Sequence, residues 1–515
     1  MKNNQAIKTF TGGPLIALLS IGSISALLCF VTAMFDFSRD DVSFTDIFFK
    51  SIQNGAVSGL PEVIIGILGV SITVVAIIVE LASNRYTARI TDLFMASGVN
   101  IGILSFFVVT GMLCLWVTVT TSNQMVPHVG SVVTIVCVAV CLILLLPYFA
   151  FVFNFLNPHN IIDRMAASVF HAIEKGGVDE RFPDRMKSNC VRGIEQLSDV
   201  ASGAIESKDK VVCMHAVDAL GRLTCDYLEI KPKLHAEWFT LTTHMRDNPD
   251  FVSMQKDVLA DIEHKNYWLE MKILRQYQML YGESLNRMRD INYLLAINTR
   301  RIAEQALKND NEQIVSLCVK FFNTYMRATI NARDVRTAYN ILNQYRLLAQ
   351  TVLESRKSLI AVDIARRFKY YGQLGFAMGL PFVLETAAYD LCDLNELAYR
   401  LDTPVKKQLL DIFLEVDKEA EADHSLEASL RGVRKAQIKL ATFYLVEGAQ
   451  SLARTIFEDM QDELPSRLSS IRQELKSIRT REFWEINDRG INFDYLESDR
   501  RAALEMFFGW FPKSR

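Results

Sequence analysis

The sequence lacks the motifs by which many enzymes and metal proteins are recognised. It has no Gly-x-x-x-x-Gly-Lys-Ser/Thr loop, no Gly-x-Gly-x-x-Gly and no Gly-x-Ser-x-Gly. It also has no His-Glu-x-x-His and no Cys-x-x-Cys, and its eight histidines are dispersed. Cys137 and Cys141 lie one helical turn apart, but no third ligand is near them, and two small apolar side chains are the simpler interpretation. We therefore expect no catalytic site, no metal and no cofactor.

An excess of charge of either sign is also absent. The 515 residues include 56 Lys and Arg and 59 Asp and Glu, of which six and seven lie before residue 156. The remainder is thus densely but evenly charged, which argues against a nucleic-acid binder, since such proteins show a basic stripe. The nine cysteines are an odd number without a close pair after residue 156, so a reducing compartment is indicated.

The first 155 residues contain four long runs that are almost free of charge, at residues 14–35, 60–82, 99–121 and 129–155. At about 1.5 Å per residue, a helix of some 23 residues reaches about 34 Å, enough to cross a hydrocarbon core of ~30 Å. The two middle runs, joined by the polar link 83–92, predict a transmembrane hairpin. No Asp, Lys, Arg or His lies in the middle of a run, which weakens the hypothesis of a proton-coupled transporter.

The loops between the runs predict an orientation. Basic residues lie in the N-terminal tail, in the hairpin link and after the fourth run; they are Lys2, Lys8, Arg85, Arg89, Arg164 and Lys175. The first loop, in contrast, is acidic. By the positive-inside rule, both termini and residues 156–515 are expected to be cytoplasmic.

The charged ends of the second run supply the candidate pore or lipid contacts. Glu80 is close in sequence to Arg85, Tyr86 and Arg89 of the link, and together they would form a polar lock at a pore mouth or a lipid-headgroup site. The alternative is that their charges simply extend into water. Glu62, at the other end, would form a ring of carboxylates in a symmetric oligomer, or act only as an interfacial acid at a helix start.

Residues 156–515 are predicted to be helical throughout, because apolar residues recur at intervals of three and four, and Gly and Pro fall between the runs. The fold class expected is all-α: four transmembrane helices, then a cytoplasmic α-helical repeat domain resembling a solenoid. We divide the chain into a membrane module at 1–156, a juxtamembrane helical domain at 157–310 and a helical-repeat domain at 311–515. One continuous apolar stripe predicts a single long helix from Glu263 to Ala306.

One stretch, at residues 434–467, resembles a tetratricopeptide unit. The residues that fall at the spacing of its two antiparallel helices are Leu440, Ala441, Tyr444, Gly448, Ala453 and Phe457, and Pro465 is expected to end the second helix. Gln437 stands where that repeat has tryptophan. Tyr444 and Phe457 are candidates for a partner surface, as is Trp510 in the aromatic tail. That tail is expected to dock on the end of the solenoid, on a neighbouring subunit or at the membrane surface.

The hairpin resembles the signature of an uncharacterised family of bacterial predicted integral membrane proteins. In that family a span ends in the pattern small-Ser-x-aromatic-Ser/Thr-x-Arg, and a Phe and a second span that starts with Gly follow. The matching positions in this chain are Ser83, Tyr86, Thr87, Arg89, Phe94 and Gly102. A second similarity covers Asp209 to Leu223, where the family's proline is absent. The resemblance, over about residues 10–230, implies a bacterial inner-membrane protein with four spans and implies no activity.

Three functions follow as hypotheses. The first is a membrane-tethered scaffold, a homo-oligomer in contact with membrane lipid, whose helical repeats bind protein partners, because solenoids offer extended surfaces. The second is an oligomeric ion channel gated by its cytoplasmic domain, with Glu62 and Glu80 near its mouths. The third, a membrane enzyme that acts on lipid, would need an acid–base pair that the sequence does not display.

Overall fold

The computed structural model describes residues 59–85, 94–95, 97–120, 128–178, 182–418, 427–486 and 488–511. Within these ranges the chain forms helices and no strand, which confirms the all-α prediction. It divides into two compact units, Met1–Arg164 and Met165–Arg515, whereas the membrane module predicted from the sequence ends at residue 156. The further division expected at residue 310 stays a prediction.

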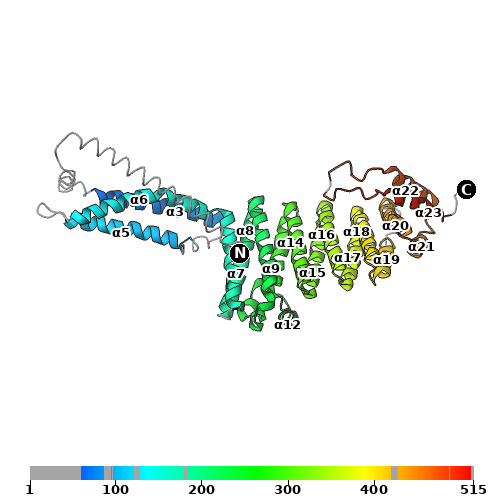
Figure 1. Cartoon of the computed structure of the whole chain (residues 1–515), viewed down its shortest axis with the longest axis horizontal. Helices are drawn as coiled ribbons and strands as arrows, with labels where there is room; N and C mark the ends of the chain where they lie inside the picture. The colour runs from blue at the N-terminus through cyan, green and yellow to red at the C-terminus, as the bar shows by residue number, and fades with distance from the viewer. Residues whose placement is uncertain are drawn as a thin grey trace. The chain divides into compact units, whose positions relative to one another are not determined.

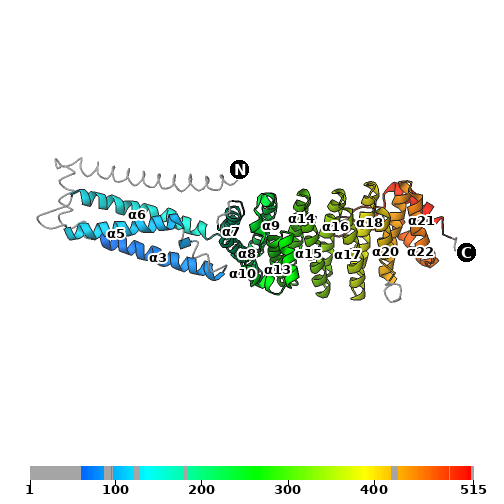
Figure 2. The ribbon, with the colours of Figure 1, turned by 90° about the horizontal axis from the view of Figure 1, so that it is seen from below.

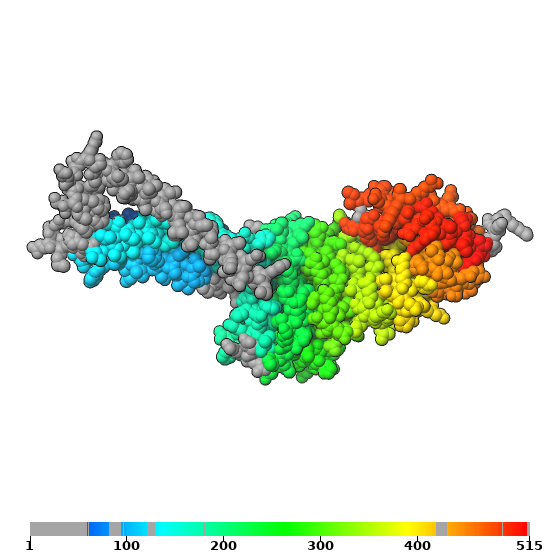
Figure 3. Space-filling view, viewed as in Figure 1, coloured from blue at the N-terminus to red at the C-terminus, as the bar shows by residue number. Residues whose placement is uncertain are grey.

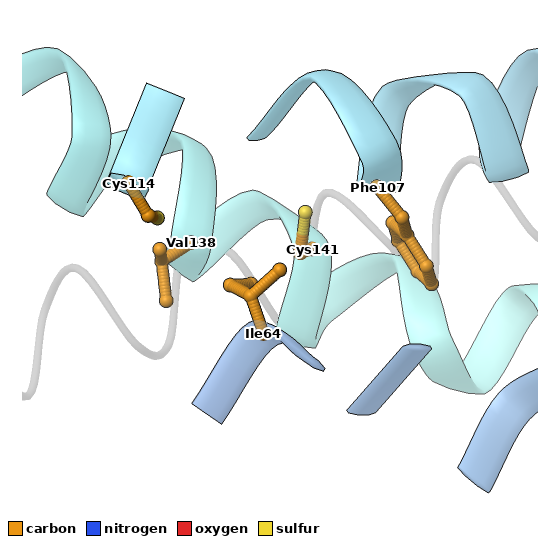
Figure 4. Packing of buried hydrophobic residues seen from close by; sticks show 5 residues of the cluster. All are labelled: Ile64, Phe107, Cys114, Val138 and Cys141. Atoms are coloured by element: carbon orange, nitrogen blue, oxygen red, sulfur yellow. The ribbon is translucent and has the colours of Figure 1, made fainter. Parts of the chain in front are cut away.

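Three helices of the first unit are long and apolar enough to cross a membrane: α3 (Leu60–Arg85), α5 (Gly98–Thr120) and α6 (His128–Phe155). They confirm three of the four predicted spans. The fourth, residues 14–35, lies outside the described residues. Figure 4 shows where the three helices meet, around Ile64, Phe107, Cys114, Val138 and Cys141. Only 22% of each apolar window is buried, so most of its side chains face outward, as lipid-facing side chains do.

The second unit is a row of helices, which Figures 1 and 2 show standing side by side. The boundary between the units falls within α7 (Pro158–Ile173). The helices that follow are α8 (Pro183–Glu206), α9 (Lys210–Ile230), α10 (Thr243–Arg246), α11 (Pro249–Val252), α12 (Lys256–His264), α13 (Trp268–Ser284), α14 (Arg289–Lys308), α15 (Glu312–Asn331), α16 (Val335–Glu354), α17 (Ser358–Ala377), α18 (Pro381–Arg400), α19 (Lys406–Leu414), α20 (Glu427–Val446), α21 (Gln450–Asp459), α22 (Pro465–Ser477) and α23 (Ser498–Phe508).

A fixed spacing organises the middle of this row. Helices α14 to α18 each contain 20 residues and start every 23 residues, at Arg289, Glu312, Val335, Ser358 and Pro381. The turns between α15 and α18 each place one residue in the left-handed region, with φ from 54° to 74°. The next residue donates its N–H to the carbonyl five positions back, as in the Schellman motif that ends many helices.

The helices pack in two layers. Helices α9, α14, α16, α18 and α20 contact one another in succession and form one layer, and α8, α13, α15, α17 and α19 form the other. Alternate helices are therefore neighbours in a layer, and consecutive ones pair across the layers. This is the arrangement of an α-solenoid, in which each repeat buries its apolar face on the next one, as the sequence predicted.

The single helix predicted from Glu263 to Ala306 is wrong, because the chain forms α12, α13 and α14 there. The breaks fall at Asn266 and Asn286, whose φ angles are 56° and 62°. Asparagine tolerates the left-handed conformation better than most side chains, so each break costs little and the apolar stripe continues across it.

The tetratricopeptide-like stretch forms a helix pair, α20 and α21, as predicted. Gly448 has a φ of 77° between them, a conformation that favours glycine. Ala441 and Ala453 are fully buried, as the close approach of two helices requires. Pro465, expected to end the second helix, instead occupies the first turn of α22, where its missing N–H costs no hydrogen bond.

Candidate partner-binding surface

An extended segment of the chain lies across one layer of the solenoid. Residues 488–497, here called the strap, contain no helix and connect α22 with α23. Figure 1 draws this part of the chain as a loop that returns from α22 toward α16, and in Figure 3 the red C-terminal residues cover the yellow and orange helices. The strap is held by side chains of α16, α18 and α20, and we call the surface they form the groove.

The first anchor of the strap is Arg489, whose side chain is only 3% exposed. Its guanidinium donates hydrogen bonds to both carboxylate oxygens of Asp390 in α18 and to the carbonyl of Tyr339 in α16, 3.2 Å away. It also lies 4.5 Å from the centre of the Tyr339 ring. Burial opposes the charge of Arg489, but the Asp390 carboxylate outweighs it and raises the pKa of the guanidinium. Arg489 and Asp390 therefore form a buried, bidentate ion pair.

The carboxylate of Asp390 is itself wholly buried. It follows that α18 presents a negative charge that needs a cation inside the groove. Arg346 of α16 lies 3.4 Å from Asp390, and it also lies 3.5 Å from the carboxylate of Asp393. Burial raises the pKa of Asp393. Arg346 is thus shared between two acids, and Arg489 completes the charge balance.

The second anchor is Phe493. Its ring stacks on Tyr389 of α18, with centroids 4.6 Å apart and an interplanar angle of 12°, and it meets the Tyr339 ring edge-on at 6.2 Å. The third anchor is the neighbouring Asp494, which accepts hydrogen bonds from the Tyr389 hydroxyl and from Lys435 of α20, the latter at 2.8 Å. An aromatic surface and a cation therefore receive adjacent residues of the strap.

The main chain of the strap is bound as well. Lys439 of α20 donates to the carbonyl of Phe493 at 3.0 Å. Gly490 has a φ of 67°, which turns the chain between the Arg489 anchor and the aromatic one. Beside the strap lies a pocket of about 260 Å³ whose lining includes Asp393, Lys439 and Arg481. The groove can thus recognise an extended polypeptide by its backbone, its charges and an aromatic ring.

The first unit contains a different polar arrangement, inside the spans. The hydroxyl of Tyr148 in α6 donates to the side-chain oxygen of Asn100 in α5 at 2.8 Å, and both residues are buried. Ser71, Thr110 and Ser131 also bury their hydroxyls, one in each helix. Such interhelical hydrogen bonds stabilise membrane helices by roughly 1–2 kcal/mol at most, so this arrangement is best explained as packing.

The residues predicted at the ends of α3 are placed only in part. Glu62 and Glu80 are both exposed, at opposite ends of the helix. Arg85 is the last residue of α3, and its side chain lies outside the described part of the molecule, as do Tyr86 and Arg89. The polar lock expected between Glu80 and the two arginines stays a prediction.

Of the three residues predicted for a partner surface, Tyr444 is not available to a partner. Its side chain is fully buried in α20, because the aromatic position of this helix pair faces the core. Phe457 and Trp510 are half-buried against each other, edge to face at 5.7 Å, and Arg454 lies over both rings at 4.9 and 5.0 Å. The aromatic tail thus docks on α21 at the end of the solenoid.

The strap residues Arg489, Phe493 and Asp494 were not predicted from the sequence. A signal was present in the printed sequence, since residues 479–497 combine several aromatic and charged side chains without the periodicity of a helix and lie between two helical stretches. Their partners on α16 and α18 are about 100 or more positions away, which no local pattern reveals.

Comparison with known proteins supports the membrane assignment. Residues 14–190 match the family model described as "Predicted membrane protein (DUF2254)", which confirms the resemblance noted at the hairpin. The second similarity, at Asp209 to Leu223, lies beyond the matched residues. No curated protein matches the chain.

One solved structure shows some similarity, a "Circular tandem repeat protein with novel repeat topology and enhanced subunit contact surfaces". The identity is 13%, and the match covers 62% of this chain and 85% of the other. Its TM-score of 0.30 is too low to carry an argument about the fold.

Proposed function

We propose that this chain is a bacterial inner-membrane scaffold, whose spans hold it in the bilayer and whose cytoplasmic solenoid presents the groove to protein partners. One observation carries the proposal: the groove already holds an extended polypeptide, the strap, by the buried Arg489 and the half-buried Phe493 and Asp494. A surface that recognises one extended segment has the chemistry to recognise another.

The proposal includes the orientation given by the basic loops, with both termini in the cytoplasm, and assembly into a homo-oligomer. It also holds that the protein is not an enzyme. Burial raises the pKa of Cys213 to about 12 and that of Cys225 to about 11, which makes these two thiols poor nucleophiles.

A second candidate function is an oligomeric ion channel gated by the cytoplasmic domain. The observation in its favour is that Glu62 and Glu80 are exposed at the two ends of α3, where a neighbouring subunit can approach them. An enzyme that acts on lipid is the weaker alternative, since no acid–base pair of the described residues supports it.

A cross-linking experiment in the living cell separates the two leading functions. A photoreactive amino acid replaces Phe382 of α18, which is 41% exposed. The matched control carries the same amino acid in the other layer, in place of Leu359 of α17, which is 81% exposed. A scaffold predicts a discrete cross-linked protein from position 382 that is absent from position 359. Lys435→Glu should abolish the product, whereas Glu62→Gln and Glu80→Gln should leave it unchanged.

The channel hypothesis predicts the opposite pattern. Purified full-length protein in liposomes would then conduct ions, Glu62→Gln and Glu80→Gln would alter the flux, and no cross-link would depend on Lys435. That combination would refute the scaffold.

A further inference from the structure

We infer that the strap is an internal competitor for the groove, and that the partner peptide presents an arginine, an aromatic residue four positions later and an acidic residue directly after it. These three would replace Arg489, Phe493 and Asp494. The inference rests on the proposed scaffold function and specifies the chemistry of the partner that the scaffold binds.

The requirement for arginine follows from the burial of Asp390. Without Arg489, this buried carboxylate would keep only Arg346, at 3.4 Å, which also serves Asp393. Leaving a buried charge without its partner is strongly unfavourable, so an empty groove is disfavoured. Arginine fits because its planar fork donates to both carboxylate oxygens, as Arg489 does, whereas lysine offers a single point of charge.

The requirement for an aromatic residue and an acid follows from α18 and α20. The rings of Tyr389 and Tyr339 form the two sides on which Phe493 packs. The Tyr389 hydroxyl and the Lys435 ammonium both donate to Asp494. A neutral residue at the acidic position would leave the buried Tyr389 hydroxyl without this acceptor and Lys435 with Glu474 alone, so the groove selects against it.

The strap can leave the groove while the ends of the loop stay in place. Beyond it, Arg500 of α23 makes two bonds of 2.7 Å to Glu396 of α18, and α23 packs on α20. Before it, Trp484 is 78% exposed and Ile486 is completely exposed, so neither side chain is buried against the solenoid. A segment tethered in this way competes at an effective concentration on the order of millimolar, so a peptide in trans binds the resting protein weakly.

Peptide binding to the full-length protein in nanodiscs tests the inference. The probe is a fluorescent synthetic peptide with the sequence of residues 485–499, measured by anisotropy against wild type and against Phe493→Ala, in which the strap is weakened. We expect the peptide to bind the variant at least tenfold more tightly than wild type. The same peptide with alanine at its arginine should bind at least tenfold more weakly, and Asp390→Asn in the protein should abolish the difference between the two peptides.

A second route releases the strap without removing an anchor. Residues 483–486 are replaced by a protease recognition sequence, and the folded protein is cleaved there, which leaves the strap attached only to α23. Cleavage should also tighten peptide binding. If the peptide fails to bind the cleaved protein, or binds equally well without its arginine, the inference is wrong.

The outcomes distinguish this inference from the proposed function. Peptide binding that does not depend on the strap, together with a cross-link at position 382 that depends on Lys435, would overturn the internal competitor and keep the scaffold. Loss of that cross-link would overturn the scaffold, whatever the peptide does.

Discussion

We predict that the ion pairs of Arg434 are the main electrostatic contribution to the stability of the last helical repeats. Its side chain is 5% exposed, and its guanidinium donates to Glu463 at 2.6 Å and to Asp459 at 2.9 Å, and lies 3.1 Å from Asp417. Burial opposes its charge, but these three carboxylates outweigh burial and raise the pKa of Arg434. One cation of α20 thereby joins residues that lie beyond α19, on α21 and before α22.

Arg434→Met would keep most of the apolar volume and remove the charge. Asp417 is 1% exposed and Glu463 is 8% exposed, so two carboxylates lose a partner inside the protein. Removing one partner of a buried ion pair costs about 3–5 kcal/mol, which is a loss of roughly 100- to 1000-fold or more in the local folding equilibrium.

Hydrogen exchange of the full-length protein in nanodiscs measures this loss as protection of the α20 and α21 amides. Arg431→Met is the matched control, one turn away on the same helix: Arg431 is 32% exposed and pairs with Glu474, so its loss should cost about 1 kcal/mol or less. Equal effects of the two substitutions would refute the reasoning.

Three further predictions concern thermal unfolding of the full-length protein. Gly375→Ala should lower the stability by about 1–3 kcal/mol, because a Cβ at this position would lie 2.8 Å from a valine side chain of α18. Gly282→Ala should raise the stability by roughly 0.5–1 kcal/mol, because a Cβ there would have no neighbour within 4 Å. Arg356→Gly should stabilise the protein by about 1 kcal/mol, because the φ of 61° at this position is strained for an arginine. An unchanged melting temperature would contradict this. Burial, and then the charge of Asp494, raise the pKa of Glu385, so the stability that Glu385 contributes when protonated is lost as the pH rises through that raised pKa. Glu385→Gln should therefore unfold at a higher temperature than wild type at pH 8 but not at pH 4. A lower unfolding temperature than wild type at pH 8 would refute this assignment.

The parts of the fold that depend on local chemistry were predictable from the sequence. The spans follow from run length and the absence of charge, because a bilayer demands both. The helical nature of residues 156–515 follows from periodicity. The breaks at Asn266 and Asn286 were missed because the apolar stripe continues through them, and only the backbone conformation changes.

The 23-residue spacing was missed for a related reason. Its recurring feature is a left-handed residue at the end of each helix, and that position is occupied by different residue types, among them Asp310, Arg333, Arg356, Gly379 and Asp402. Since the conformation recurs and the side chain does not, a search for repeated residues fails. A search for helix ends at equal intervals would have found it.

The groove could not be predicted, because each anchor is a contact between distant parts of the chain. Arg489 and Asp390 read separately as one charged residue in a loop and one acid in a helix, and both would ordinarily be assigned to the surface. Tyr444 shows the converse error. An aromatic residue at a repeat position was assigned to a partner surface, although the same spacing places it in the core.

A fluorine NMR spectrum of the full-length protein, with fluorophenylalanine at position 493, tests the central claim most directly. If the strap occupies the groove, the signal is displaced from the free-peptide position by the ring current of Tyr389, and it returns toward that position in Tyr389→Ala. An excess of the peptide of residues 485–499 should likewise shift it toward the free position. A signal at the free-peptide position in the unmodified, peptide-free protein would mean that the strap does not lie in the groove, and would contradict the account.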